Sequence, residues 1–167
     1  MLETARLQLA PWQPDDWLPL RPIATDPRVM RYISDGKPWP EERIREFVSR
    51  QIGHCDRLGY CLWKLLLKDT KEMIGFCGLQ PLEGTAETEM GWWLAQEWWE
   101  RGLATEAART ALHDGFERAG LARIVAVAVA ANRASIHVME KLGMKYERET
   151  IHRGFEVVQY AVNRPGR

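Results

Sequence analysis

Three strand-like runs, followed by a helix-like segment and a buried run, constrain the fold of this chain more than any other feature. The runs YCLWKLLL, EMIGFCGLQP and ETEMGWWLA are joined by the turn-rich segments KDTK and LEGTA, which is the pattern of an antiparallel meander. Small and apolar residues then recur at helical spacing between Ala104 and Phe116, and ARIVAVAVAA is typical of a buried strand. A meander that continues into strand, helix and strand predicts a mixed α+β domain built on one sheet.

The segments on either side extend this sheet to about seven strands flanked by helices. Apolar and polar residues alternate near the start, apolar stripes at helical spacing follow the proline-rich region, and Gly143 ends the last helical pattern. We expect a strand at 5–11, short helices near 15–21 and 26–32, helices over PEERIREFVSRQIGHC and RASIHVMEKL, and closing strands at about 145–152 and 155–163.

Composition restricts the class of protein. The 167 residues fit a single domain spanning 1–167, and 23 basic residues balance 23 acidic ones, which argues against nucleic acid as the main partner. The opening MLETARLQLAPW does not resemble a signal peptide, and the apolar run IVAVAVAA is too short to cross a membrane. Cys55, Cys61 and Cys77 form no CxxC pair, so we expect no metal site, no disulfide framework and a cytoplasmic location.

The segment EWWERGLATEAA, residues 97–108, has three interpretations. In the first, Gly102 and Ala104 let a ligand approach the backbone, and the free amides of the first helical turn bind an anion such as phosphate. In the second, Gly102, Ala104 and Ala107 approximate a dinucleotide-binding pattern, but QEWWER intervenes and the next strand ends without an acid. In the third, the glycine is an ordinary loop residue. The spacing alone leaves the phosphate site and the ordinary loop both open.

The surrounding motifs resemble those of the GNAT acetyltransferases. TEMGWWLAQEWWERGLATEAA is similar to the family's strand that leads through Q/R-x-x-G-x-G/A into a helix. VAAN with RASIHVMEKLGM resembles the next strand and its N-x-x-S…EKLGF helix, and LETARLQLAPW resembles the start of the RimJ/RimL-like branch. The resemblance covers nearly the whole chain. It implies the GNAT fold, a mostly antiparallel sheet with a V-shaped splay between its fourth and fifth strands.

The resemblance also implies a cosubstrate site without a metal. Acetyl-CoA would lie in the V, and the reaction would move its acetyl group directly to an amine. The pantetheine arm would run along the strand edge and contact the next helix, and the pyrophosphate would sit on backbone amides. The implied binding residues are Trp92, Trp93, Leu94, Arg101, Gly102, Leu103, Ala104, Thr105, Asn132 and Ser135.

Three positions depart from the family pattern. Trp99 stands where relatives carry Gln or Arg, so a side-chain contribution to the phosphate loop is absent. Glu100 stands where many carry a second glycine, and an acid there should weaken binding unless it points to solvent. Met139 replaces a tyrosine that protonates the departing thiolate in many relatives, and methionine cannot donate a proton. The backbone amides remain, so we expect cosubstrate binding to survive.

The identity of the acceptor amine sets how much catalysis the site must supply. An α-amino group with a pKa near ~8 is about one-tenth neutral at pH 7, whereas a lysine with a pKa near ~10.4 is neutral in only about one molecule in 2,500. An N-terminal acceptor therefore needs little help from a base, and a lysine needs an effective one.

Glu89 is the expected general base. It lies two residues before Gly91 on the strand beside the expected acetyl position, and Glu87 shares its face as the alternative. The competing interpretation of Glu89 is a solvated acid on an exposed strand face. Ser135 matches the N-x-x-S position and is expected to return a proton to the thiolate, although serines early in helices also commonly bond the backbone, here near Asn132.

Other groups have weaker claims to a catalytic role. Tyr146 and Tyr160 offer hydroxyl groups but are typical of sheet aromatics, and His137 is typical of an outward-facing helical histidine. A strand amide at Trp93 or Leu94 would hold the developing oxyanion.

Two classes of function follow from these residues. The first is an acetyl-CoA-dependent N-acetyltransferase acting on a protein N-terminal α-amine or a small-molecule amine, with Trp39 of GKPWPEE in an acceptor lid. The second is a catalytically weak or inactive CoA-binding module that acts as a sensor or scaffold. The altered phosphate loop and Met139 keep this second class open. The aromatic content is compatible with a monomer or a homodimer.

Overall fold

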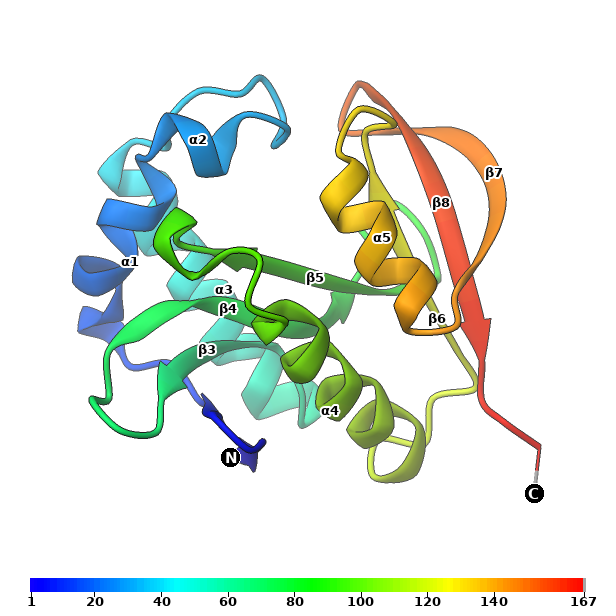
Figure 1. Cartoon of the computed structure of the whole chain (residues 1–167), viewed down its shortest axis with the longest axis horizontal. Helices are drawn as coiled ribbons and strands as arrows, with labels where there is room; N and C mark the ends of the chain where they lie inside the picture. The colour runs from blue at the N-terminus through cyan, green and yellow to red at the C-terminus, as the bar shows by residue number, and fades with distance from the viewer. Residues whose placement is uncertain (167) are drawn as a thin grey trace.

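The computed structural model describes residues 1–166, whose strands form one sheet in the order β1-β2-β3-β4-β5-β6-β8-β7 (Figure 1). The strands are β1 Leu2–Glu3, β2 Leu7–Ala10, β3 Leu62–Leu67, β4 Met73–Pro81, β5 Thr88–Leu94, β6 Arg123–Ala128, β7 Lys145–His152 and β8 Phe155–Asn163. The helices are α1 Trp17–Ala24, α2 Pro27–Met30, α3 Glu41–Leu58, α4 Leu103–Glu117 and α5 Arg133–Lys141, with short 3₁₀ turns η1 Pro14–Asp16 and η2 Gln96–Trp98.

The predicted mixed fold with a mostly antiparallel sheet is confirmed, with eight strands rather than about seven. The additional strand is β1, which pairs with β2 over two positions and is too short to show an alternating pattern. Among the described strands, every neighbouring pair is antiparallel except β5 with β6. The predicted splay therefore falls between β5 and β6.

The strands β5 and β6 meet at one point and then separate. Their single paired position places Glu89 opposite Val125, whereas β6 pairs with β8 over six positions. In Figure 1, β3, β4 and β5 run across the view, while β6 and β8 run steeply beside them. The backbone of β5 beyond Glu89 consequently has no neighbouring strand on its β6 side.

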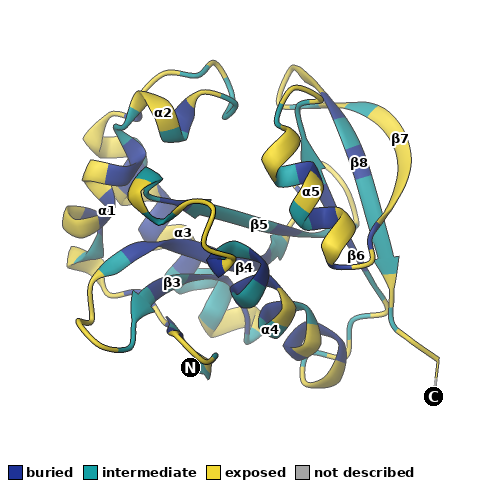
Figure 2. Cartoon of the chain, in the orientation of Figure 1, coloured by how far each residue is buried: buried dark blue, intermediate teal, exposed yellow. Residues whose placement is uncertain are grey.

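The helices α3 and α4 cover opposite faces of the meander. Side chains alternate along β4, so Phe76 meets Phe47 of α3 while Leu79 lies against Gly115 of α4. A Cβ on Gly115 would come within 2.5 Å of the Leu79 Cδ1 atom, and the absence of that carbon lets α4 lie close to the sheet. In Figure 2 the buried residues gather on the inward sides of these layers, and β7 is mostly exposed.

An aromatic cluster around Phe47 holds α3 to the sheet. The Phe47 ring centroid lies 5.6 Å from that of Trp12, 5.7 Å from Trp39, 4.8 Å from Phe76 and 6.4 Å from Trp93. Phe47, Trp12, Trp39 and Phe76 are buried. Several of the tryptophans thus supply core packing, because large aromatic rings bury much apolar area in preferred tilted or edge-on arrangements.

Truncating this ring should destabilise the whole domain. Phe47→Ala removes the centre of the cluster and leaves a cavity, so we expect a loss of about 3–5 kcal/mol in the free energy of unfolding. Urea unfolding followed by tryptophan fluorescence measures it. Leu18→Ala is the matched control, because Leu18 is 54% exposed and its truncation should change stability by less than about 0.5 kcal/mol. Equal effects of the two substitutions would contradict the central position of Phe47.

Candidate active site

The loop before α4 leaves three backbone amides unbonded within the helix. Gly102, the residue before α4, has φ +75° and no side chain to cap the helix. The first helical bond runs from the Glu106 amide to the Gly102 carbonyl, so the amides of Leu103, Ala104 and Thr105 have no partner within the helix. Together with the positive end of the helix dipole, these amides form a site suited to an anion.

Glu106, the acid in the first turn of α4, is hydrogen-bonded and ion-paired to residues of the N-terminal segment. The Thr4 hydroxyl donates to one Glu106 oxygen at 2.5 Å, and the Arg6 Nε donates to the other at 2.9 Å. Burial alone would raise the pKa of Glu106, but these hydrogen bonds outweigh it and lower the pKa. A Cβ on Gly102 would lie 3.7 Å from an Arg6 Nη atom, so this guanidinium stands beside the start of the helix.

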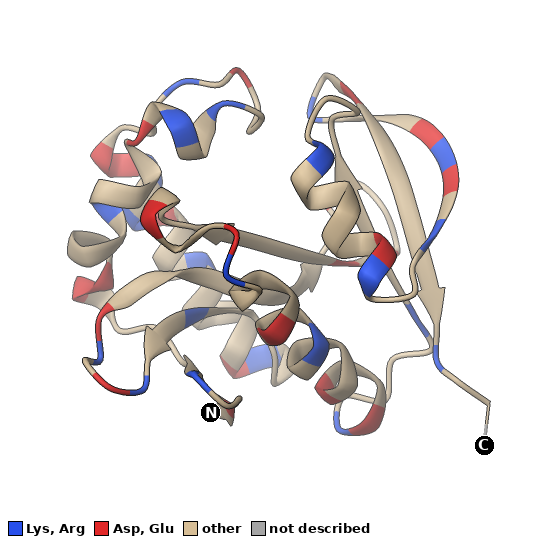
Figure 3. Cartoon of the chain, viewed as in Figure 1, with Lys and Arg blue, Asp and Glu red and all other residues tan. Residues whose placement is uncertain are grey.

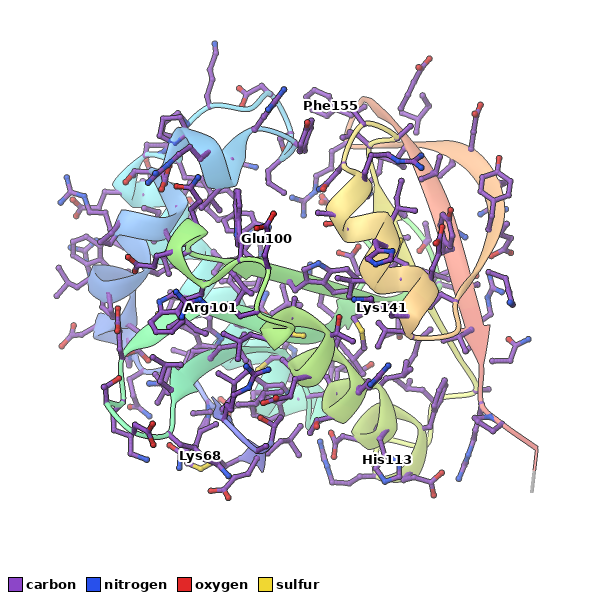
Figure 4. All side chains as sticks on the ribbon, in the orientation of Figure 1. Lys68, Glu100, Arg101, His113, Lys141 and Phe155 are labelled. Carbon is purple, nitrogen blue, oxygen red and sulfur yellow. The ribbon has the colours of Figure 1, made fainter. Side chains whose placement is uncertain are left out.

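The two tryptophans of the loop hold its shape. Trp99 is 40% exposed, and its indole Nε1 donates to the Leu94 carbonyl at 2.8 Å. The Arg101 guanidinium lies 4.8 Å from the centre of the Trp98 ring. Glu100 adopts φ +60°, the left-handed conformation that glycine favours, and its side chain is exposed. Figure 4 labels Glu100 and Arg101 on this loop.

Hydrogen bonding to β4 determines which amides of β5 face the opening. The Ala95 amide donates to the Ile74 carbonyl at 2.8 Å, and the register is continuous along β5. Because the bonds of antiparallel pairs alternate, the Trp93 amide also faces β4. Of the two amides predicted to hold an oxyanion, Trp93 and Leu94, this geometry favours that of Leu94. The amides of Trp92 and Leu94 face away from β4, toward the opening.

A cavity of about 180 Å³ lies where β5 and β6 part, and some of the predicted site residues line it, namely Glu89, Trp92, Trp93, Asn132 and Ser135. Leu94 and residues 101–105 do not line this cavity. Glu89 lines it from β5, and Asn132 and Ser135 line it from the start of α5. Met139 of α5 also lines the cavity, and the residue is 1% exposed. Residues separated by more than 40 positions in the chain thus face one space.

Glu89 is half-buried and does not lie on a solvated strand face. The Gln80 amide donates to its Oε1 at 2.8 Å. Burial raises the pKa of Glu89, while the hydrogen bond from Gln80 and the charge of Arg153 oppose this shift in part. Glu87, the alternative base, does not line the cavity; its carboxylate is paired with Arg123 at 3.0 Å.

Asn132 caps the helix that carries Ser135. The Asn132 Oδ1 accepts a hydrogen bond from the Ser135 amide at 3.3 Å, which is the expected geometry of an N-cap. The cap uses the side-chain oxygen and leaves the Asn132 amide hydrogens for another partner. It also directs the first turn of α5 toward the cavity, where both residues are half-buried.

The structure separates the remaining candidates. His137 is exposed, and neither Tyr146 nor Tyr160 lines the cavity. The rings of the two tyrosines instead pack against each other, with their centroids 5.8 Å apart. Sequence reasoning missed Tyr32 and His152, which line the cavity from the α2–α3 loop and the end of β7. No local pattern marks these two, because only tertiary packing brings their segments to β5.

Comparison with known proteins then identifies the family. A profile described as "Acetyltransferase (GNAT) domain" matches residues 6–145. The chain belongs to the GNAT acetyltransferase family. YnaD of Bacillus subtilis, described as an uncharacterised N-acetyltransferase, is 30% identical over 146 residues, which cover 87% of this chain and 83% of that protein. The solved structure of a GNAT-family acetyltransferase from Bacillus anthracis matches with a TM-score of 0.83 at 28% identity, over 98% of both chains.

A more distant structure bears on the RimJ/RimL-like branch. RimL, described as a ribosomal L7/L12 α-N-protein acetyltransferase in complex with coenzyme A, matches with a TM-score of 0.78 over 96% of this chain and 95% of that one. The identity is 18%, so the likeness concerns the fold alone. This GNAT protein is thus an acetyltransferase by family, and its place in that branch stays a prediction.

The remaining expectations from the sequence concern the cysteines, metal ligands and membrane-spanning helices. All three cysteines are free, and burial raises the pKa of the Cys61 and Cys77 thiols. Within residues 1–166, no three His, Cys, Asp or Glu side chains are grouped as metal ligands. Over the same residues, no helix combines the length and the apolar character needed to cross a membrane. Figure 3 shows basic and acidic residues interspersed along the ribbon.

Glu89→Gln should stabilise the fold in a pH-dependent way. Because the folded-state pKa of Glu89 is raised, the unfolded chain ionises first as the pH rises, and the native state is destabilised. The variant should therefore melt at a higher temperature than the parent above the folded pKa. The advantage should vanish below about pH 4, where both states hold the proton. Thermal unfolding at a series of pH values tests this.

Glu140→Gln, at an exposed position on α5, is the control for the loss of a carboxylate. Its melting temperature should follow that of the parent across the series. A difference between Glu89→Gln and the parent that stays constant with pH would show that the environment of Glu89 does not favour its neutral form.

Proposed function

We propose that this GNAT protein is an acetyl-CoA-dependent N-acetyltransferase that moves an acetyl group directly to a primary amine. The observation that carries the proposal is the meeting of Glu89, Asn132 and Ser135 at one cavity, at the point where β5 and β6 part. A carboxyl, an amide and a hydroxyl line one space there, together with apolar side chains. This arrangement can bind a thioester and exchange protons with an amine.

The residues present fit acetyl-CoA as cosubstrate. The pyrophosphate would be bound by the free amides of Leu103, Ala104 and Thr105, after the left-handed Gly102. The pantetheine arm would follow β5 along Trp92, Trp93 and Leu94, with the amides of Trp92 and Leu94 as donors. Asn132 would bond the arm through its amide hydrogens, and Arg101 would add positive charge at the loop.

The acceptor would approach from the α3 side. A second cavity of about 820 Å³ adjoins the first and shares Trp39, Arg50, Gln80 and Arg153 with it. The Trp39 indole is 7% exposed, and its Nε1 has no hydrogen-bond partner within residues 1–166. Buried donors normally find partners, so this group supports an acceptor-binding role for the wall that contains Trp39. In this proposal Trp39 belongs to a buried wall of the acceptor site rather than to the acceptor lid expected from the sequence.

Glu89 would act as general base and Ser135 as general acid. Acetyl-CoA supplies an activated thioester. Glu89 would take one proton of the acceptor ammonium, directly or through water, so that the neutral amine can attack the thioester carbonyl. As the carbon–nitrogen bond forms and the carbon–sulfur bond breaks, Ser135 would give its proton to the thiolate sulfur and regain one from the second proton that the nitrogen releases. The amide of Leu94 or Trp92, rather than that of Trp93, would stabilise the developing oxyanion. Met139 stands in the wall and takes no part in proton transfer.

The preferred acceptor is an α-amine, either of a protein N-terminus or of a small molecule. An α-amine needs about 1.4 kcal/mol for deprotonation at pH 7, against roughly 4.6 kcal/mol for a lysine. One half-buried carboxyl suffices for the smaller cost.

A panel of amines tests the function itself. With acetyl-CoA as donor, release of free thiol should be detected with at least one α-amine, among N-terminal peptides of varied sequence and small amines. Lysine side chains of N-terminally blocked peptides should react more slowly. The outcome that contradicts enzymatic activity is saturable acetyl-CoA binding without turnover on any amine, which would instead indicate a CoA-binding module that acts as a sensor or scaffold.

The two proposed catalytic residues should be separable by kinetics. Glu89→Gln should lower turnover by at least about tenfold while the affinity for acetyl-CoA changes little, because the base acts on the acceptor. Ser135→Ala should slow transfer at least about tenfold. Isothermal titration with acetyl-CoA and steady-state rates on the best acceptor measure both. Normal turnover in Ser135→Ala would assign the proton of the thiol to water or to another group.

A further inference from the structure

A chain of three hydrogen bonds runs from the backbone of β3 to Glu89. The Leu62 amide donates to Gln51 Oε1 at 2.9 Å, and Gln51 Nε2 donates to Gln80 Oε1 at 2.9 Å. Gln80 Nε2 then donates to Glu89 Oε1 at 2.8 Å. Gln51 comes from α3 and is fully buried, whereas Gln80 and Glu89 face each other across the β4–β5 pair. Four elements, β3, α3, β4 and β5, therefore meet in one polar chain.

The chain begins at Leu62 because the sheet is incomplete there. Pairing between β2 and β3 ends at Ala10 opposite Lys64, so the backbone of Leu62 extends past the end of β2. Two side chains therefore form the hydrogen bonds of the Leu62 backbone amide and carbonyl. Gln51 accepts from the amide, and the Trp12 indole donates to the carbonyl. A buried backbone amide left without a partner would be costly, which explains a fully buried glutamine at this point of α3.

The backbone amide fixes the direction of every bond in the chain. A peptide N–H can only donate, so the atom of Gln51 that meets Leu62 is its oxygen. The Gln51 amino group must then face Gln80, and the Gln80 amino group must in turn face Glu89. Glu89 Oε1 is thereby an acceptor in both protonation states of the carboxyl. A proton taken up by Glu89 goes to Oε2.

We propose that Gln51 and Gln80 are positioning residues that reserve Oε2 of Glu89 for proton exchange with the acceptor amine. The proposal rests on the base role given to Glu89 above. Gln80 holds the carboxyl in place, and Gln51 prevents the Gln80 amide from turning its oxygen toward the carboxylate. With that oxygen turned, two acceptors would face each other and the ionised form of Glu89 would be disfavoured.

Charged and titratable groups of the surrounding elements also act on Glu89. Burial raises its pKa, the Gln80 bond and Arg153 lower it, and Glu83 raises it. Arg153 is itself paired with Glu83 at 2.9 Å, so these two charges largely offset each other. The other titratable side chains that line the cavity are Tyr32 from the α2–α3 loop, Arg50 from α3 and His152 from the end of β7.

The first test replaces Gln80 by leucine in the full-length protein. The loss of the donor should raise the midpoint of the Glu89 titration by about one pH unit. The measurement is the carbon-13 shift of the Glu89 carboxyl in glutamate-labelled protein, assigned by its disappearance in Glu89→Gln. The acid limb of the pH–rate profile with the best acceptor should move upward by the same amount.

Gln51→Leu is the second variant, and Gln159→Leu is the matched control. Gln51→Leu frees the Gln80 amide to turn, so it should shift the midpoint in the same direction by a smaller amount. Gln159 is also buried, but it lies on β8 and donates to Glu147. Its replacement should lower the melting temperature without moving the Glu89 midpoint, which separates positioning from loss of stability.

The two readouts distinguish the proposal from the function on which it rests. An unchanged Glu89 midpoint in Gln80→Leu would overturn the positioning role, whatever the activity. A raised midpoint with an equally raised acid limb supports both the positioning role and the base role. A raised midpoint with an unchanged pH–rate profile supports the positioning role of Gln80 at the carboxyl and overturns the base role of Glu89.

Discussion

The separation of β5 from β6 is the constraint on which the rest of this structure depends. The two strands share one paired position, and beyond it the sheet has an internal edge. Backbone amides of β5 that a neighbouring strand would normally use stay free, and the cavity forms at the same point. An unpaired edge inside a sheet is costly unless something covers it. In the proposed function the extended arm of acetyl-CoA covers this edge, so one departure from regular pairing would create the binding site.

The two faces of the meander pack against different helices and contribute different groups to the site. On the α4 side, Gly115 and buried alanines bring the helix close to the sheet, so its free N-terminal amides stand at the end of the opening. On the α3 side, Phe47 and its aromatic neighbours make a rigid packing, and the glutamine chain passes beside it to Glu89. A buried polar chain is stable only if each member is satisfied, and here each glutamine both accepts and donates a hydrogen bond.

Much of the fold could be predicted, because strands and helices in this chain carry strong local patterns. The meander, the small-residue helix α4 and the buried β6 were all visible as periodicity, and only the two-residue β1 was too short to see. The candidate site was predictable in part. Glu89 and Ser135 lie in segments with motifs, and Gln80 could have been found by extending the hairpin register from the LEGTA turn. The sequence could not decide between the amides of Trp93 and Leu94 as oxyanion donor, because the direction of an amide depends on strand pairing that composition does not reveal.

The sequence by itself determined the elements, their order and the glycine turn before α4, since these follow from side-chain spacing and backbone preference within short segments. Only the tertiary structure decided that Glu89 is half-buried, that Glu87 is held by Arg123, and that Tyr32 and His152 join the cavity. It also decided that Gln51 on α3 reaches the end of β3. The physical reason is that burial, pKa and hydrogen-bond direction are properties of groups brought together from distant segments, and no local pattern encodes them.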